Sequence, residues 1–97
     1  MNNEPKLDLK HFLSHTHMYV YPLNFDNVAN YLNGYEHGIN NKDITSNLKQ
    51  FVIKNHSVNS SSDGWIGQMK RLSNRLNQTP LETFKEVVSN LIEKINT

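Results

Sequence analysis

Cysteine is absent from this chain of 97 residues, which excludes a disulfide framework, a thiolate zinc site and a cysteine nucleophile. Long apolar runs are also missing, because the longest, from Met18 to Tyr21, has four residues and is far too short to span a membrane. The first residues of the chain lack the basic and then apolar pattern of a signal peptide. We therefore expect a protein that acts in the cytoplasm.

A charge excess of one sign is lacking as well, since ten Lys and Arg residues against nine Asp and Glu residues leave a net charge of +1. Dedicated nucleic-acid binders usually carry a strong basic excess. The small total hides a segregated pattern. Residues 1–40 hold four acids and two bases, residues 41–78 hold six bases and two acids, and residues 79–97 hold three acids and two bases. The basic helix of this middle segment has no aromatic residue apart from Trp65, so the interleaving of basic and aromatic residues that stacks bases is absent.

Apolar residues are numerous enough for a folded domain. Leu, Ile, Val and Phe make up 26 of the 97 residues, which is above the roughly 20% below which chains stay disordered. The length is that of one domain, so we expect residues 1–97 to form a single unit. Helical spacing prevails and no strand pair with a hairpin turn is evident, which predicts a compact all-α bundle of about five helices.

The first half of the chain predicts two of these helices. A short one around Phe12 is followed by an extended connector from Met18 to Pro22. A second helix begins after Asn24, which is placed as its N-cap, and Gly38 is expected to end it.

The middle of the chain predicts two more helices. Asp43 can cap the first of them, which leads into a polar, turn-rich loop over residues 55–64. The next helix is expected to direct five apolar side chains inward, namely Trp65, Ile66, Met69, Leu72 and Leu76.

The strongest local signal opens the last helix. Thr79 occupies the N-cap position, Pro80 follows at the first helical position, and Glu82 completes a capping box. Behind this start runs a long apolar stripe made of Leu81, Phe84, Val88, Leu91 and Ile95.

Three of the five histidines, His11, His15 and His17, lie close together in the sequence. His11 and His15 have the i, i+4 spacing of many zinc sites, but no carboxylate completes a ligand set. His15, His17 and Lys10 carry groups suited to general acid–base cleavage of RNA, although no orienting acid and no Gly-rich phosphate loop accompany them. We therefore expect no metal, no cofactor and no enzymatic activity.

All four tyrosines lie between positions 19 and 35, and tyrosine is enriched at protein interfaces. Tyr19 and Tyr35 are expected to pack inward. Tyr31 lies at the edge of its helix stripe, where acidic neighbours can imitate an RNA backbone toward a basic nuclease. These considerations predict a contact face that includes Asp26, Asn30, Tyr31 and Glu36.

Short motifs along most of the chain resemble one known family. They are Phe12, Met18-Tyr19-Val20, Leu32-Asn33-Gly34-Tyr35, Phe51, Ser62-Asp63-Gly64-Trp65-Ile66 and the stretch 84–95. Together they resemble the small helical immunity proteins of bacterial toxin–immunity systems, including those of contact-dependent growth inhibition. The resemblance implies structural roles for Met18, Tyr19, Gly34, Tyr35 and Trp65, with Gly34 permitting close helix packing and Tyr35 filling the core.

The same resemblance implies a function without chemistry of its own. The protein would bind the C-terminal domain of a cognate toxin, a nuclease with an RNase favoured, and block its active site or substrate path. It would touch neither nucleic acid nor membrane, and would be a monomer before it binds the toxin. Two alternatives stay open: a small nucleic-acid-associated regulator that uses Lys70, Arg71 and Arg75, and a toxic ribonuclease that uses the histidines.

Overall fold

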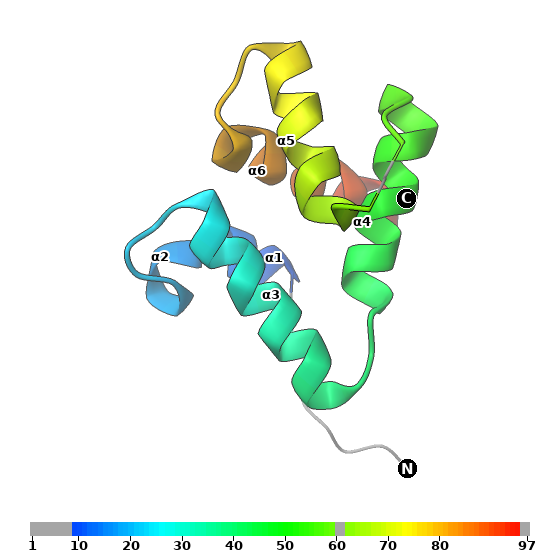
Figure 1. The fold of residues 1–97 in the computed structure, drawn as a ribbon. Helices are drawn as coiled ribbons and strands as arrows, with labels where there is room; N and C mark the ends of the chain where they lie inside the picture. Colours follow the sequence, from blue (N-terminus) through cyan, green and yellow to red (C-terminus); the bar gives the residue numbers. More distant parts are fainter. Residues whose placement is uncertain (1–8, 60–61, 96–97) are drawn as a thin grey trace.

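Helices form all of the regular structure in residues 9–59 and 62–95, the part of the chain that the computed structural model describes (Figure 1). They are α1 (Leu9–Ser14), α2 (Thr16–Tyr19), α3 (Phe25–Ile39), α4 (Asp43–His56), α5 (Gly64–Leu76) and α6 (Pro80–Ile95). The predicted all-α bundle is confirmed, and its Cα radius of gyration of 13.1 Å is that of a compact chain of this size. None of the described helices is both long and apolar enough to cross a membrane.

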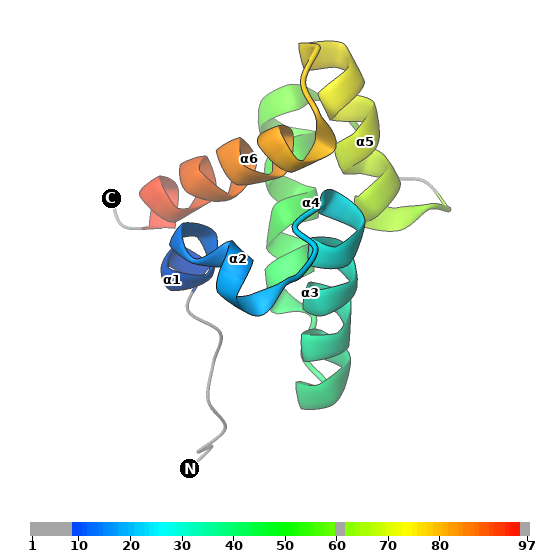
Figure 2. The same cartoon turned by 90° about the vertical axis from the view of Figure 1, so that its left-hand side faces the viewer.

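The helix α6 lies at the centre of the bundle and contacts α1, α3, α4 and α5. Figure 2 shows it running across the molecule, with α1 and α2 on one side and α5 on the other. The stripe predicted for this helix is buried through Phe84, Val88 and Leu91, and the side chain of Ile95 lies outside the described part. Because these positions recur every three or four residues, one face of α6 supplies most of its contribution to the core.

Two helix boundaries differ from the predicted ones. The segment after Ser14 forms the single turn α2, so Met18 and Tyr19 are helical and extended backbone begins only at Val20. Gly38 does not end α3, because the helix continues to Ile39 and closes at Asn40, which adopts the left-handed conformation (φ 53°). Asparagine tolerates that conformation better than most residues.

The starts of α3 and α6 are capped by local side chains, as predicted. The side chain of Asn24 accepts a hydrogen bond from the Asn27 N–H (2.9 Å) at the start of α3. At the start of α6, the Glu82 N–H donates to the Thr79 hydroxyl (3.2 Å) and the Thr79 N–H donates to the Glu82 carboxylate (2.9 Å). Asp43 instead belongs to the first turn of α4, and its N–H donates to the Asn41 side chain (2.8 Å).

A buried carboxylate connects α3 to α4. Glu36 is only 3% exposed, and its two oxygens accept hydrogen bonds from the Thr45 hydroxyl (2.6 Å) and the Thr45 N–H (3.0 Å). The prediction that Glu36 belongs to a contact face is therefore wrong. Its carboxylate stabilises the fold by accepting a hydrogen bond from an N–H in the first turn of α4 that has no partner within the helix.

Polar side chains also fix α5 in place. The buried Gln68 amide donates to the carbonyls of Val58 (2.7 Å) and Lys49 (3.2 Å). The indole N–H of Trp65 donates to the Asn33 side chain on α3 (3.0 Å). Trp65 is buried as predicted, whereas Leu76, at the end of α5, is 38% exposed and does not point inward.

The connection between α3 and α4 gives a first prediction. Thr45→Val keeps the shape of the side chain but leaves one oxygen of the buried Glu36 carboxylate without its hydroxyl donor. We expect a loss of about 2 kcal/mol in the free energy of unfolding measured with urea. Thr45→Ser retains the hydroxyl and is expected to lose about half as much or less. Equal losses in the two variants would show that the hydroxyl has no special role.

The capping box gives a second prediction. Thr79→Ala is expected to lower the free energy of unfolding by about 1 kcal/mol. The Thr79 N–H, and after it the Thr79 side chain, hold the pKa of Glu82 below its ordinary value. The stability that Glu82 contributes is therefore present at neutral pH and lost as the pH falls through the lowered pKa in the folded state.

The test of this pH dependence compares the wild type with Glu82→Ala in urea denaturation from neutral pH down to about pH 3, below the ordinary glutamate pKa of about 4.3. We expect the advantage of the wild type to shrink over the acid end of the range. An advantage that is the same at every pH would contradict a role for the ionised carboxylate.

Candidate binding surface

The four residues of the predicted contact face are not equally available. Asp26 and Asn30 are exposed on α3, one turn apart. Glu36 is buried, and Tyr31 is half-buried and packed against the core. Only the first two residues of the predicted set therefore lie on an open surface.

Tyr31 belongs to an aromatic cluster between α1, α2 and α3. Its ring stacks on Phe12 at a centroid distance of 5.4 Å and meets the edge of Tyr19 at 5.7 Å. Burial, and after it the nearby phenols of Tyr19 and Tyr35, raise the pKa of Tyr31 above its ordinary value. The ring of Tyr31 is thus used mainly for packing.

The five residues for which the resemblance implies structural roles differ in how deeply they are buried. Trp65 is buried and Tyr19 is half-buried against the core, as expected. Tyr35 is only half-buried, so it does not fill the core. Met18 is 69% exposed and is not a packing residue. Gly34 permits no close helix contact, because no atom lies within 4 Å of the place where a Cβ would stand.

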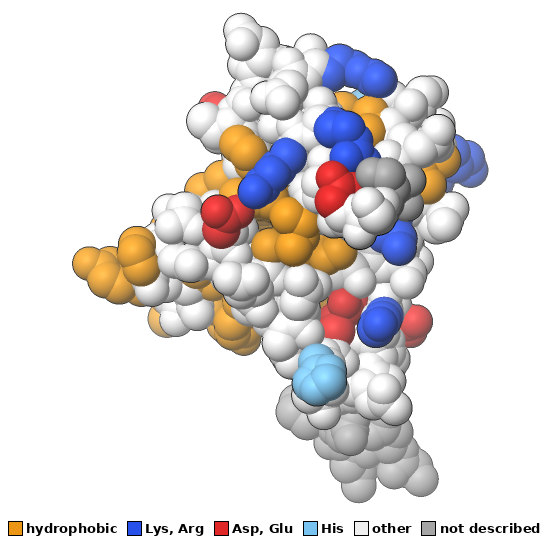
Figure 3. Space-filling view, viewed as in Figure 1, with side chains coloured by type: hydrophobic (Ala, Val, Ile, Leu, Met, Phe, Trp, Pro, Cys, Tyr) orange, Lys and Arg blue, Asp and Glu red, His pale blue; other side chains and the backbone are white. Residues whose placement is uncertain are grey.

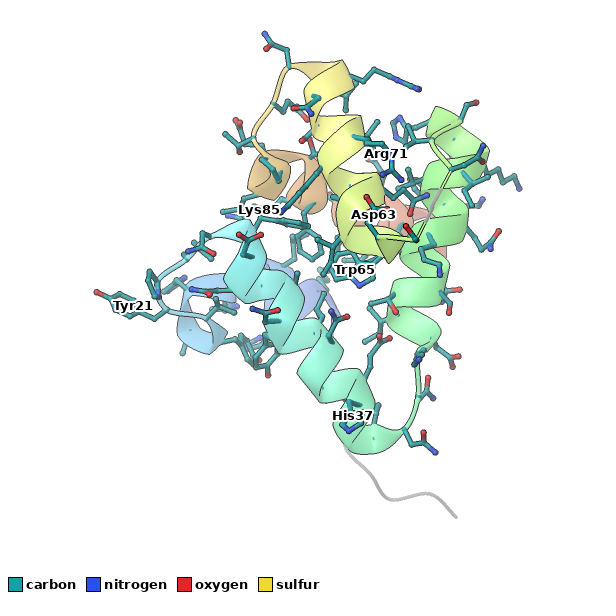
Figure 4. The ribbon with its side chains drawn as sticks, in the orientation of Figure 1. Tyr21, His37, Asp63, Trp65, Arg71 and Lys85 are labelled. Atoms are coloured by element: carbon teal, nitrogen blue, oxygen red, sulfur yellow. The ribbon has the colours of Figure 1, made fainter. Side chains whose placement is uncertain are left out.

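Basic side chains of α5 are already engaged within the fold. Lys70, Arg71 and Arg75 were the residues assigned to the nucleic-acid alternative. Their partners are the Asp26 carboxylate for Lys70 (3.2 Å), the Asp63 carboxylate (2.7 Å) and Asn59 carbonyl (2.9 Å) for Arg71, and the His56 carbonyl for Arg75 (2.7 Å). Figure 4 shows Arg71 close to Asp63 at the start of α5. Each of the three side chains thus has a partner within the described fold.

The histidines form a stacked pair. The rings of His11 and His15 are nearly parallel at a centroid distance of 4.3 Å, and His17 is exposed. The hydroxyl of Ser14 donates to the Lys10 carbonyl (3.0 Å). Among the described residues, no group of three His, Asp or Glu side chains could hold a metal ion.

An exposed apolar feature that the sequence did not predict lies between α2 and α3. Tyr21 is 94% exposed, Met18 is 69% exposed and Leu23 is 38% exposed. We call these three residues the apolar knob. Figure 3 shows apolar side chains protruding at this edge of the molecule, and Figure 4 shows Tyr21 pointing away from the helices. Leu76 is the one other large apolar side chain with comparable exposure in the described part of the chain.

The backbone on both sides of Tyr21 is held in place. Val20, just before it, is buried, and its N–H donates to the Thr16 carbonyl (3.0 Å). The Pro22 carbonyl, just after it, accepts a hydrogen bond from the Asn27 side chain (2.8 Å). The fold therefore presents Tyr21 to solvent from a fixed position.

A cleft of about 550 Å³ lies on another part of the surface, between α3, α4 and the start of α5. Its walls include Asn33, Gly34 and His37 from α3, and Lys42, Ser46 and Lys49 at the start of α4 and along it. Trp65 and Gly64 close it at the start of α5. The cleft and the apolar knob share no residue.

No family model matches this chain, and no curated protein or solved structure is significantly similar to it. The resemblance to immunity proteins thus depends on the short motifs, and the function must be inferred from the surface that the fold presents.

Proposed function

We propose that this protein is an immunity protein, which binds the toxic C-terminal domain of a cognate bacterial toxin and blocks it by occlusion. The binding surface consists of the apolar knob and the adjacent exposed residues Asp26 and Asn30 of α3. The toxin domain is a nuclease, with an RNase favoured, and the complex forms in the cytoplasm of the cell that makes the immunity protein. The protein carries out no chemistry of its own and is a monomer until it binds.

The observation that carries this proposal is the exposure of the knob. Tyr21, Met18 and Leu23 lie within six residues of one another, in a chain that buries its other large aromatic side chains wholly or in part. Clustered exposed apolar side chains mark interaction sites on soluble proteins. Tyrosine is also among the residues that contribute most to binding energy at interfaces.

The fixed position of Tyr21 supports the same proposal. When a partner buries a side chain that an ordered backbone presents, only side-chain rotamer freedom is lost and no backbone has to be ordered. The hydrogen bonds at Val20 and Pro22 provide that order. Tyr21 is therefore suited to act as an anchor that enters a pocket of the toxin.

Polar residues next to the knob complete the surface. The side chain of Asp26 is 72% exposed and pairs with Lys70, whose side chain is 47% exposed. An ion pair this exposed contributes little to stability, so its charges can exchange for partner contacts at little cost. Asn30 lies one turn further along α3 and extends the polar rim that is typical of interfaces.

Truncation of the knob tests the proposal. Against the toxin domain encoded beside this gene, Tyr21→Ala is expected to raise the dissociation constant by about 30-fold or more, which corresponds to the loss of about 2 kcal/mol at an interface anchor. Leu23→Ala is expected to raise it by about fivefold, because a smaller and partly covered apolar side chain is removed. Calorimetry and protection of cells that express the toxin provide the measurements.

Leu76→Ala is the matched control, since Leu76 and Leu23 are both 38% exposed and only Leu23 belongs to the knob. This variant is expected to bind the toxin like the wild type. Tyr21→Ala is expected to change the free energy of unfolding by less than about 0.5 kcal/mol, because the side chain is almost fully exposed. Unchanged toxin affinity in both knob variants would refute this surface as the binding site.

A further inference from the structure

The cleft between α3, α4 and α5 is a second surface feature. It takes no part in the proposed binding of a toxin by the knob. Its volume of about 550 Å³ lies within the range of sites for small ligands. Most of the residues around it are polar or cationic, unlike those of the knob, although the surface that they expose to the cleft is mainly apolar.

One wall of the cleft is rich in hydrogen-bond donors and positive charge. Lys42, Ser46 and Lys49 follow one another at intervals of four and three residues, at the start of α4 and along it, and so lie on one face. No described acidic side chain lies within ion-pair distance of Lys42 or Lys49. These two ammonium groups thus add charge that the described fold does not pair.

The opposite wall, formed by α3, offers few hydrogen-bond acceptors to a ligand. Asn33 uses its side-chain oxygen to accept from Trp65, which leaves its amide N–H groups as donors. Glu36 is the one acidic residue in the lining, and its carboxylate is buried, with each oxygen accepting one hydrogen bond from Thr45, so little of it is exposed to a ligand. The cleft therefore has more donors than acceptors to offer a ligand.

Gly34 keeps the α3 wall open. A glycine inside a helix costs about 1 kcal/mol relative to alanine. Nothing in the packing requires it here, because no atom lies within 4 Å of the position of a Cβ at residue 34. The absence of a side chain at this position leaves this part of the cleft wall open.

We propose that this cleft binds a phosphate group, either free or as the monoester of a nucleotide. A phosphate offers several acceptor oxygens and a double negative charge, which matches two lysines, a serine hydroxyl and an asparagine amide. Lysine binds phosphate as a point charge and does not need a fixed planar geometry. This inference is independent of toxin binding and of the knob.

Titration of the full chain, observed by ¹⁵N–¹H NMR, tests the proposal with inorganic phosphate and, separately, with AMP, at constant ionic strength. We expect saturable shifts of the amides of Gly34 and Thr45 and of the Trp65 indole N–H with at least one of the two probes. Saturation by inorganic phosphate at the same or lower concentration than AMP indicates free phosphate. Tighter binding of AMP indicates a nucleotide monoester.

Two variants and one control locate the site. The double variant Lys42→Gln with Lys49→Gln is expected to weaken binding at least tenfold. Gly34→Leu, which fills the cleft without changing the net charge and favours the helix, is expected to do the same. Lys54→Gln removes a positive charge from the same helix outside the cleft, and is expected to change the affinity by less than twofold.

The inference fails if neither probe gives saturable shifts in the wild type. It also fails if Lys54→Gln weakens binding as much as the double variant does, because the effect would then reflect net charge only. Circular dichroism and urea denaturation of Gly34→Leu establish that it is folded. If it is folded and still binds with the affinity of the wild type, the ligand lies outside the cleft.

Discussion

Four helices, α1, α3, α4 and α5, bury apolar side chains against α6. Phe84 on α6 is nearly inaccessible to solvent, and its ring lies 6.1 Å from that of Phe25 on α3 and 6.2 Å from that of Trp65 on α5. Burial of a side chain of this size contributes about 2–3 kcal/mol to folding. All four neighbours pack against this one helix. The side of each neighbour that contacts α6 is therefore buried, and the opposite side faces solvent or a partner.

Buried polar contacts then fix the neighbours relative to one another. The Glu36 carboxylate holds α3 to the start of α4, and the Gln68 amide holds α5 to the segment after α4. Such contacts are demanding, because a buried polar group that loses its partner is costly. On the surface, the basic side chains of α5 also have partners within the fold. In the described part of the chain, the apolar knob lies exposed on one part of the surface and the cleft lies on another.

Local signals in the sequence were sufficient for much of this structure. Asn24 and Thr79 cap helices as predicted, since a capping side chain interacts only with the next turn of the chain. The stripe of α6 follows from spacing alone. The charge of Glu36 favours exposure, but Glu36 lies four residues after the buried Leu32 on the same face of α3. That spacing was the available signal for burial.

Other features depend on contacts that the sequence does not reveal. Gly34 in a helix is compatible with close packing or with open space, and only the positions of the other helices decide between them. Met18 and Tyr21 are the ends of the longest apolar run in the sequence, and apolar side chains of this size are usually buried. Tyr21 is exposed because it lies where the chain turns between the buried residues Val20 and Phe25, whereas Met18 lies on the solvent side of the single turn α2. The candidate binding surface was therefore only partly predictable, through Asp26 and Asn30.

We propose that the knob and the exposed start of α3 form the surface that a toxin covers. Hydrogen–deuterium exchange of the protein, alone and in complex with the toxin domain, tests it most directly because it needs no substitution. We predict that slower exchange in the complex concentrates in residues 18–30, with α4 and α6 exchanging as in the free protein. Slower exchange confined to α4 and α6, with residues 18–30 unchanged, would contradict the account.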